Sequence, residues 1–130
     1  MLKRFAIVTA LLFGGCGALL AQAITGTVSP SAEATRVIST AAARLVGAYA
    51  TNTTGTDGYL LVLNLTSAPA DGAVTPRDCV RLPANGSASI FYANRPKAYN
   101  TGITIVLSSA STCFTKTTGT ITGFISGMAD

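Results

Sequence analysis

Runs of apolar residues alternate with turn-forming residues along most of this chain, which predicts a protein built from short β-strands. The strongest run covers residues 58–65 and is apolar almost throughout, as is typical of a central strand covered on both faces of its sheet. Residues 102–107 form a second run of this kind. Residues 88–92 alternate instead, with Ile90 on one face and Phe91 on the other.

Shorter strands are predicted at residues 80–82, 113–117 and 121–125, the first of them at a sheet edge because a proline follows it. Gly, Pro, Asn and Asp separate the runs and mark the turns. Short strands at this spacing predict an all-β fold, a single antiparallel β-sandwich of about seven or eight strands over residues 36–130. We expect its core to centre on the two apolar runs.

The segment over residues 31–49 has a different pattern. Its apolar positions recur at helical spacing, and Ser31 is placed to cap a helix. The same segment also divides into two strands, at residues 37–38 and 44–50, and the periodicity alone favours the helix. Residues 24–35 are small, polar and contain a proline, which predicts a linker or N-terminal arm.

The chain begins with a short cationic stretch and an apolar run over residues 5–21, which predict an N-terminal hydrophobic helix. The run ends in Ala-Gln-Ala, where the small residues Ala21 and Ala23 match a signal-peptidase site. We therefore expect residues 1–23 to be a signal peptide that is cleaved after Ala23, so that the chain is exported. Two alternatives stay open: an uncleaved anchor, which would be the one membrane contact, and lipid attachment at Cys16.

Charge is sparse in this sequence and histidine is absent. Only 11% of the residues are charged and 48% are hydrophobic, which favours a folded domain over a disordered arm. The formal net charge of +4 includes Lys3 and Arg4, which the predicted cleavage removes, so we expect no nucleic-acid partner. Without His there is no Ser-His or Cys-His nucleophile pair, and the commonest metal ligand is missing. We expect no catalytic residue, no metal and no cofactor.

The acidic residues give no pattern of a catalytic pair. Asp57 and Asp71 each precede a glycine, which is typical of turns in which the carboxylate accepts hydrogen bonds from nearby backbone. A calcium site at one of them is the alternative, although no cluster of neighbouring acidic residues supports it.

Basic and aromatic residues lie close together near the middle of the chain. Tyr92, Arg95, Lys97 and Tyr99 would form a contact surface for protein or for a surface glycan if they were exposed together. The alternative is that the charges lie on solvated edges and loops and prevent edge-to-edge pairing of strands.

Three cysteines are present, and only Cys79 and Cys113 remain after the predicted cleavage. Two cysteines in an exported domain predict one disulfide, and two buried free thiols are the alternative. Metal binding by two cysteines without a histidine is not expected.

Several blocks of sequence occur in a familiar order, at residues 58–62, 67–76, 101–103, 112–117 and 124–127. They resemble a group of small proteins encoded in tailed phages and prophages, which are mostly unannotated or suspected virion components. The resemblance implies a β-sandwich in which residues 36–39 and 44–50 are strands, and it implies that Cys79 and Cys113 are partners.

The resemblance also implies a function. It indicates a non-catalytic structural or interaction module such as a capsid-decoration, fibre or tail accessory protein, whose partners are copies of itself or a viral capsid or tail shell. The alternative is an exported adhesin-like or glycan-binding domain of a bacterium. The expected location is accordingly the virion or the exported (periplasmic or extracellular) fraction.

Overall fold

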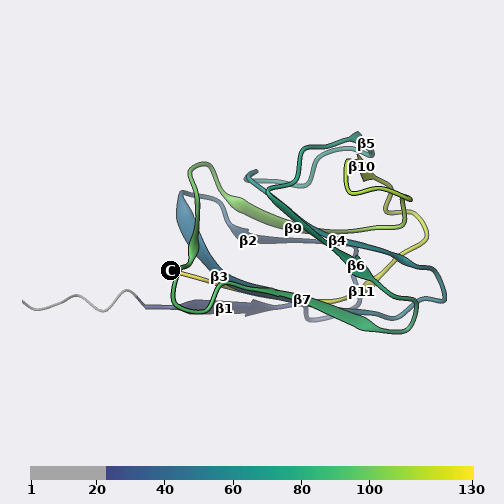
Figure 1. Ribbon diagram of the computed structural model, residues 1–130, viewed down its shortest axis with the longest axis horizontal. Helices are drawn as coiled ribbons and strands as arrows, with labels where there is room; N and C mark the ends of the chain where they lie inside the picture. The colour runs from purple at the N-terminus through teal and green to yellow at the C-terminus, as the bar shows by residue number, and fades with distance from the viewer. Residues whose placement is uncertain (1–22) are drawn as a thin grey trace, which may run out of the picture.

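The computed structural model describes residues 23–130, which form two antiparallel sheets packed face to face (Figure 1). The first sheet has the order β1 (Thr25–Val28), β11 (Gly123–Ala129), β3 (Ala43–Asn52) and β7 (Ser87–Phe91), and β8 (Lys97–Tyr99) also pairs with β3. The second sheet has the order β2 (Thr35–Ser39), β9 (Ile103–Ser108), β4 (Gly58–Leu63) and β6 (Asp78–Leu82). Two short strands, β5 (Gly72–Ala73) and β10 (Thr115–Lys116), pair outside the second sheet.

The all-β, antiparallel prediction is therefore confirmed, and the arrangement is sandwich-like. The two main sheets contain more strands than expected for two reasons. Residues 24–35, predicted to be a linker or arm, contain β1, which pairs with the last strand β11. In addition, β8 follows the turn after β7 and was not predicted from the sequence.

The helix favoured by periodicity over residues 31–49 is wrong. This segment forms β2 and most of β3, as the resemblance implied. Ala48 and Ala50 face the core while Tyr49 between them is exposed, which is the two-residue period of a strand. Pairing of β3 with β11 on one side and β7 on the other satisfies the backbone and outweighs the local preference.

The main core lies between the sheets and is made of apolar side chains from both. Its buried members are Leu45, Ala48, Ala50, Leu60, Val62, Leu82, Tyr99, Ile103, Ile105, Leu107, Ile121, Ile125 and Ala129. A second cluster of Leu61, Leu63 and Val106 lies on the other face of the second sheet, against Tyr59, Val74, Cys79 and Cys113. Strand β4 is thus covered on both faces, as its continuous apolar run predicted.

Residues 1–22 lie outside the described part of the chain. The predicted N-terminal helix, the small residue Ala21 of the cleavage site and the lipidation alternative at Cys16 all fall there; Ala23 is the first described residue. Within residues 23–130, no helix is long and apolar enough to cross a membrane.

Candidate functional site

Three of the four residues predicted to form a contact surface meet instead at one carboxylate. Tyr92, Lys97 and Tyr99 all donate hydrogen bonds to Oδ2 of Asp78; the distance is 2.6 Å from Lys97 Nζ and 3.1 Å from Tyr99 Oη. Lys97 Nζ also donates to the carbonyl of Arg77 at 2.8 Å. Asp78 begins β6 of the second sheet, whereas its three donors lie on or beside β7 and β8 of the first. The cluster therefore ties the two sheets together at one end.

The protonation states in this cluster suit a structural tie. Burial opposes ionisation of Asp78, but the hydrogen bonds from Lys97, Tyr92 and Tyr99 together outweigh it and hold the pKa of this carboxyl below its usual value. Burial, with the adjacent Asp78 carboxylate, raises the pKa of both tyrosine hydroxyls well above their usual value. Asp78 is thus an ionised acceptor shared by three donors, and the tyrosines remain protonated donors.

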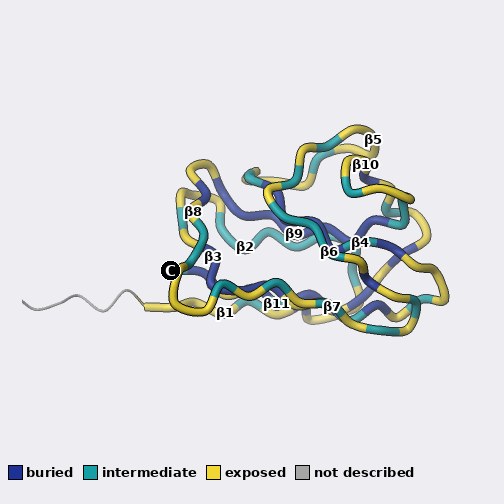
Figure 2. The backbone as a smooth tube through the Cα atoms, viewed as in Figure 1, coloured by how far each residue is buried: buried dark blue, intermediate teal, exposed yellow. Residues whose placement is uncertain are grey.

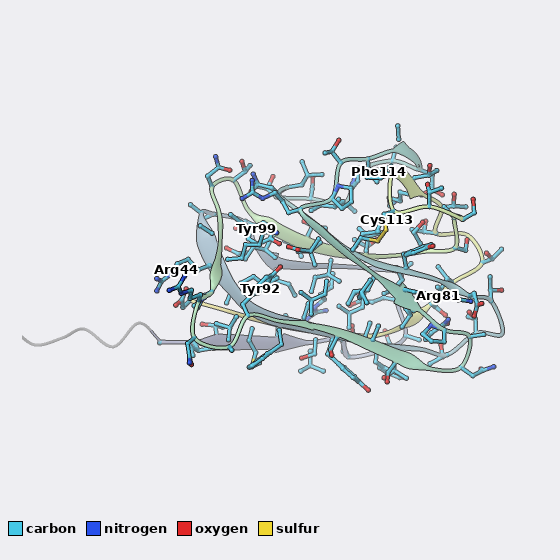
Figure 3. The ribbon with its side chains drawn as sticks, viewed as in Figure 1. Arg44, Arg81, Tyr92, Tyr99, Cys113 and Phe114 are labelled. Carbon is cyan, nitrogen blue, oxygen red and sulfur yellow. A yellow bond between two sulfur atoms is a disulfide. The ribbon has the colours of Figure 1, made fainter. Side chains whose placement is uncertain are left out.

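The predicted contact surface has to be corrected. Tyr99 is only 1% exposed and belongs to the core, so it does not face a partner. Tyr92 is half-buried with its hydroxyl on Asp78, and only Arg95 is exposed on the turn after β7. Figure 3 shows Tyr92 and Tyr99 together at the same end of the molecule as Arg44. The sequence placed these side chains close together, but it gave no sign of the carboxylate that draws them inward.

An open groove of about 670 Å³ lies beside this cluster and is lined by residues of the paired strands β3 and β8. Arg77 lines it, with its guanidinium 5.7 Å from the centre of the Tyr99 ring and an Nη2 hydrogen bond to the carbonyl of Ala98. Arg44 also lines the groove and forms a two-pronged ion pair with Asp130, at 3.0 and 2.7 Å. The charged groups of the groove are thus engaged with neighbours in the same chain.

The other acidic residues also hold local structure together. Asp57 accepts hydrogen bonds from the backbone of Ala84 and from Arg81, and these lower its pKa. Asp71 accepts them from Lys116 and Thr118, with the same effect on its pKa. Within residues 23–130, no group of three or more His, Cys, Asp or Glu is arranged to hold a metal ion.

Cys79 and Cys113 lie at disulfide distance, with their Sγ atoms 1.94 Å apart and their Cα atoms 5.9 Å apart. Cys79 is on the edge strand β6, and Cys113 is in the segment between β9 and β10 (Figure 3). The bond therefore ties the segment that leads into β10, and with it the β5–β10 pair, to the second sheet. The structure brings together the two cysteines that the cysteine count predicted to pair.

The most distinctive surface is the solvent-facing side of the first sheet, which we call the outer face. Paired residues of neighbouring strands form three rows across this face, two rows of four residues and one row of three. The first row is Gly26, Met128, Gly47 and Phe91; the second is Val28, Ser126, Tyr49 and Ser89; the third is Phe124, Thr51 and Ser87. None of these residues is charged. Figure 2 shows exposed stretches along β1, β11 and β7 on this side of the molecule.

Large and small residues alternate across the first two rows of the outer face as on a checkerboard, whereas in the third row Phe124 is followed by the smaller Thr51 and Ser87. In the first row Met128 and Phe91 are separated by Gly47, and in the second row Val28 and Tyr49 are separated by Ser126. Each large side chain therefore stands beside small ones both along its strand and across to the next strand. The gaps that remain open lie beside Ser126 and Ser89, because the ring of Phe91 covers Gly47 and the hydroxyl of Tyr49 accepts a hydrogen bond from Thr51 Oγ1 at 3.0 Å.

One gap is deep enough to form a hollow of about 180 Å³. Tyr49, Phe91 and Met128 surround it, and Gly47, Ser89 and Ser126 form much of the rest of its lining. Phe91 is 66% exposed and Tyr49 is 46% exposed, so both project from the sheet beside the hollow. Aromatic residues and Met are enriched at the centre of protein interfaces and charged residues are depleted there, and the outer face shares both of these features.

Sequence patterns alone did not identify this outer face. The alternation in residues 88–92 correctly separated Phe91 from Ile90, but Phe124, Met128 and Tyr49 were not singled out. The sequence over residues 123–129 does contain one signal of an exposed apolar face. Large apolar residues occur on both sides of this strand, with Phe124 and Met128 on one side and Ile125 on the other. Their neighbours across the sheet follow only from the register of β11 with β1 and β3.

Comparison with known proteins adds no relative to this picture: no family model matches the chain, and searches of curated proteins and of solved structures found no match.

Proposed function

We propose that this chain is a non-catalytic structural or interaction module that acts by burying the outer face of its first sheet against protein. The observation that carries the proposal is the combination of Tyr49, Phe91, Phe124 and Met128, all exposed, on a face without charged residues. The largest apolar patch on a domain, typically a few hundred Å² in area, is often its interaction surface.

The setting of this module is a virion, where it would serve as a decoration, fibre or tail accessory protein. The resemblance of the sequence blocks to small phage and prophage proteins supports this setting. A rigid sheet face is also suited to repeated contacts, because a surface that is already ordered loses little conformational entropy on binding.

An exported adhesin-like domain is the second candidate, and the cysteine pair favours it. A Cys79–Cys113 disulfide is typical of proteins that fold outside the reducing cytoplasm, and the signal-like sequence over residues 1–23 agrees with export. Both candidates use surface burial and differ in where the chain functions and what it touches. A glycan-binding version would need a contact surface other than Tyr99, because that side chain is buried.

Fractionation with intact-mass measurement separates the two candidates. The full coding sequence is expressed in the native host, and particles, cytoplasm, periplasm and medium are collected. We expect the chain in purified particles, and we expect Phe91→Lys to reduce its amount there while Phe114→Lys leaves it unchanged. Phe114 is a matched control because it is 65% exposed and lies beside the β5–β10 pair, on the side of the molecule opposite the outer face (Figures 1 and 3). A chain that begins at Ile24, found in the periplasm or medium and absent from particles, would contradict the virion setting and support the second candidate.

A further inference from the structure

We propose that the partner of the outer face is a second copy of this chain, packed face to face across a two-fold axis. This inference rests on the proposed function, because it takes the outer face to be an interaction surface. It adds the identity of the partner and the way in which the two surfaces fit.

The absence of charge on the outer face favours a second copy as the partner. Two copies of one chain carry the same net charge, and like charges brought together across an interface oppose association. The outer face avoids this cost because every residue in its three rows is uncharged. A partner selected by complementary charge would find no group on this face to recognise, whereas a second copy needs none.

The shape of the outer face also favours a second copy as the partner. In a two-fold interface the same patch is used twice, so the patch has to be complementary to itself. A checkerboard meets this condition, because a half-turn and a small shift set the large residues of one copy over the small residues of the other. Alternation of large and small residues is also what lets facing layers interdigitate in protein cores.

The hollow gives this fit a specific location. At about 180 Å³ it is slightly larger than a cavity of about 150 Å³ that accommodates a benzene ring. Phe91 and Tyr49 stand beside it and project from the same face, so each copy presents both an aromatic side chain and a place to receive one. Two copies would therefore fill two equivalent hollows.

Polar groups at the two ends of the outer face complete the resemblance to an interface. At one end Arg44 and Asp130 form their ion pair, and at the other Thr53 Oγ1 donates to the carbonyl of Thr122 at 2.9 Å. These groups already satisfy one another, so they can form the rim of an interface without losing partners. An apolar centre with a polar rim is the usual anatomy of an interface.

The size of the face sets the expected affinity. Four strands spaced by about 4.8 Å and three rows spaced by about 6.8 Å give a projected area of roughly 400 Å² for each copy. The two copies together therefore bury about 800 Å², which is below the roughly 1,000 Å² of a stable specific interface and corresponds to a weak, transient pair. We expect a dissociation constant in the micromolar range and a dimer that is visible only when the concentration is varied.

Sedimentation equilibrium over a concentration series tests the proposal. The protein is produced from its full coding sequence, with the N-terminus that the cell leaves and that intact mass defines. We expect a reversible monomer–dimer equilibrium for the wild type and for Phe114→Lys, and at least tenfold weaker association for Phe91→Lys. Circular dichroism of each variant establishes that it is folded.

A second variant distinguishes interdigitation from general stickiness. Ser126→Phe fills the hollow and adds apolar surface, so interdigitating faces would associate at least tenfold more weakly, whereas a merely sticky face would associate more tightly. Unchanged or tighter association of Ser126→Phe, or a wild type that is monomeric at every concentration, would overturn the proposal.

If the wild type is monomeric but Phe91→Lys still loses its place in particles, the proposed function stands and the partner is another protein. If a dimer forms and the chain is absent from particles, the partner stands and the virion setting fails.

Discussion

The ring of Phe91 lies over Gly47 on the neighbouring strand: a Cβ added to Gly47 would come within 2.8 Å of Cδ2 of Phe91. The absence of a side chain at Gly47 thus lets an aromatic ring lean across β3, which leaves the hollow beside it. The shape of the outer face depends on this pair.

A double-mutant cycle tests this relationship. In the wild type, Gly47→Ala should destabilise the protein, because the new methyl group displaces the Phe91 ring. In a Phe91→Ala background the same change should destabilise the protein less, because the ring is gone and the remaining close neighbour is the carbonyl oxygen of Ile90, 3.3 Å from the added Cβ. Urea denaturation at low protein concentration gives both values for the monomer. Equal effects of Gly47→Ala in the two backgrounds would contradict the contact.

Adjacent residues on β11 should respond in opposite ways to truncation. Ile125 is fully buried in the core and Phe124 is 45% exposed on the outer face. We expect Ile125→Ala to lower the free energy of unfolding by about 2–5 kcal/mol, because it leaves a cavity in the core. Phe124→Ala should cost less than about 1 kcal/mol but weaken dimer formation. Chemical denaturation and sedimentation of the two variants check both halves, and the reverse ranking would mean that the register of β11 is shifted by one residue.

The disulfide between Cys79 and Cys113 should contribute strongly to stability. The cysteines are 34 positions apart, and closing a loop of that length stabilises a protein by roughly 4 kcal/mol according to the chain-entropy estimate. We therefore expect reductant, or replacement of both cysteines by serine, to lower the denaturation midpoint in urea. The double serine variant is its own control, because reductant should not affect it further. Two free thiols in the mass spectrum of the unreduced protein would exclude the bond.

The Asp78 cluster predicts a dependence of stability on pH. The pKa of Asp78 is lower in the folded protein than in the unfolded chain, where it is about 3.9. Its contribution is therefore fully present above that value and is lost as the pH falls through the lower, folded-state pKa. Asp78→Asn should destabilise the protein at pH 7 by about 1–3 kcal/mol, since three donors lose a charged acceptor. It should also flatten the loss of stability in acid.

Asp57→Asn is the matched control for this cluster. Its ion pair with Arg81 is exposed to solvent, with more than half of each side chain accessible, so its removal should have a smaller effect. Thermal unfolding from pH 2 to pH 7 compares the two variants. An equal loss of stability at pH 7 in both would contradict the structural role assigned to Asp78.

The sequence predicted those parts of the fold that depend on local pattern. The apolar run over residues 58–65 identified β4 and its cover on both faces, because a strand without polar positions has no face to present to water. The segment over residues 31–49 was misjudged, because its backbone is paired with β9, β11 and β7, strands far away in the sequence. Local periodicity carries no information about such pairing.

The candidate site was predictable to a smaller extent for the same reason. Phe91 was placed opposite Ile90 by simple alternation, but the outer face exists only because β1, β11, β3 and β7 stand side by side. Likewise Tyr92 and Tyr99 were recognised as neighbours, while Asp78, which turns their hydroxyls inward, lies more than a dozen residues earlier on the other sheet. Register and sheet order decide both features.

The most direct test of the account observes the outer face itself during self-association. The chain contains two methionines, Met1 and Met128, and Met128 lies on the outer face. In a methyl-labelled sample its NMR signal should shift with protein concentration in the wild type and in Phe114→Lys, and should not shift in Phe91→Lys. Mixed-labelled samples should also show contacts between this methyl group and an aromatic ring of the other copy. A Met128 signal that is independent of concentration while the protein dimerises would show that the outer face is not the surface at which the two copies meet.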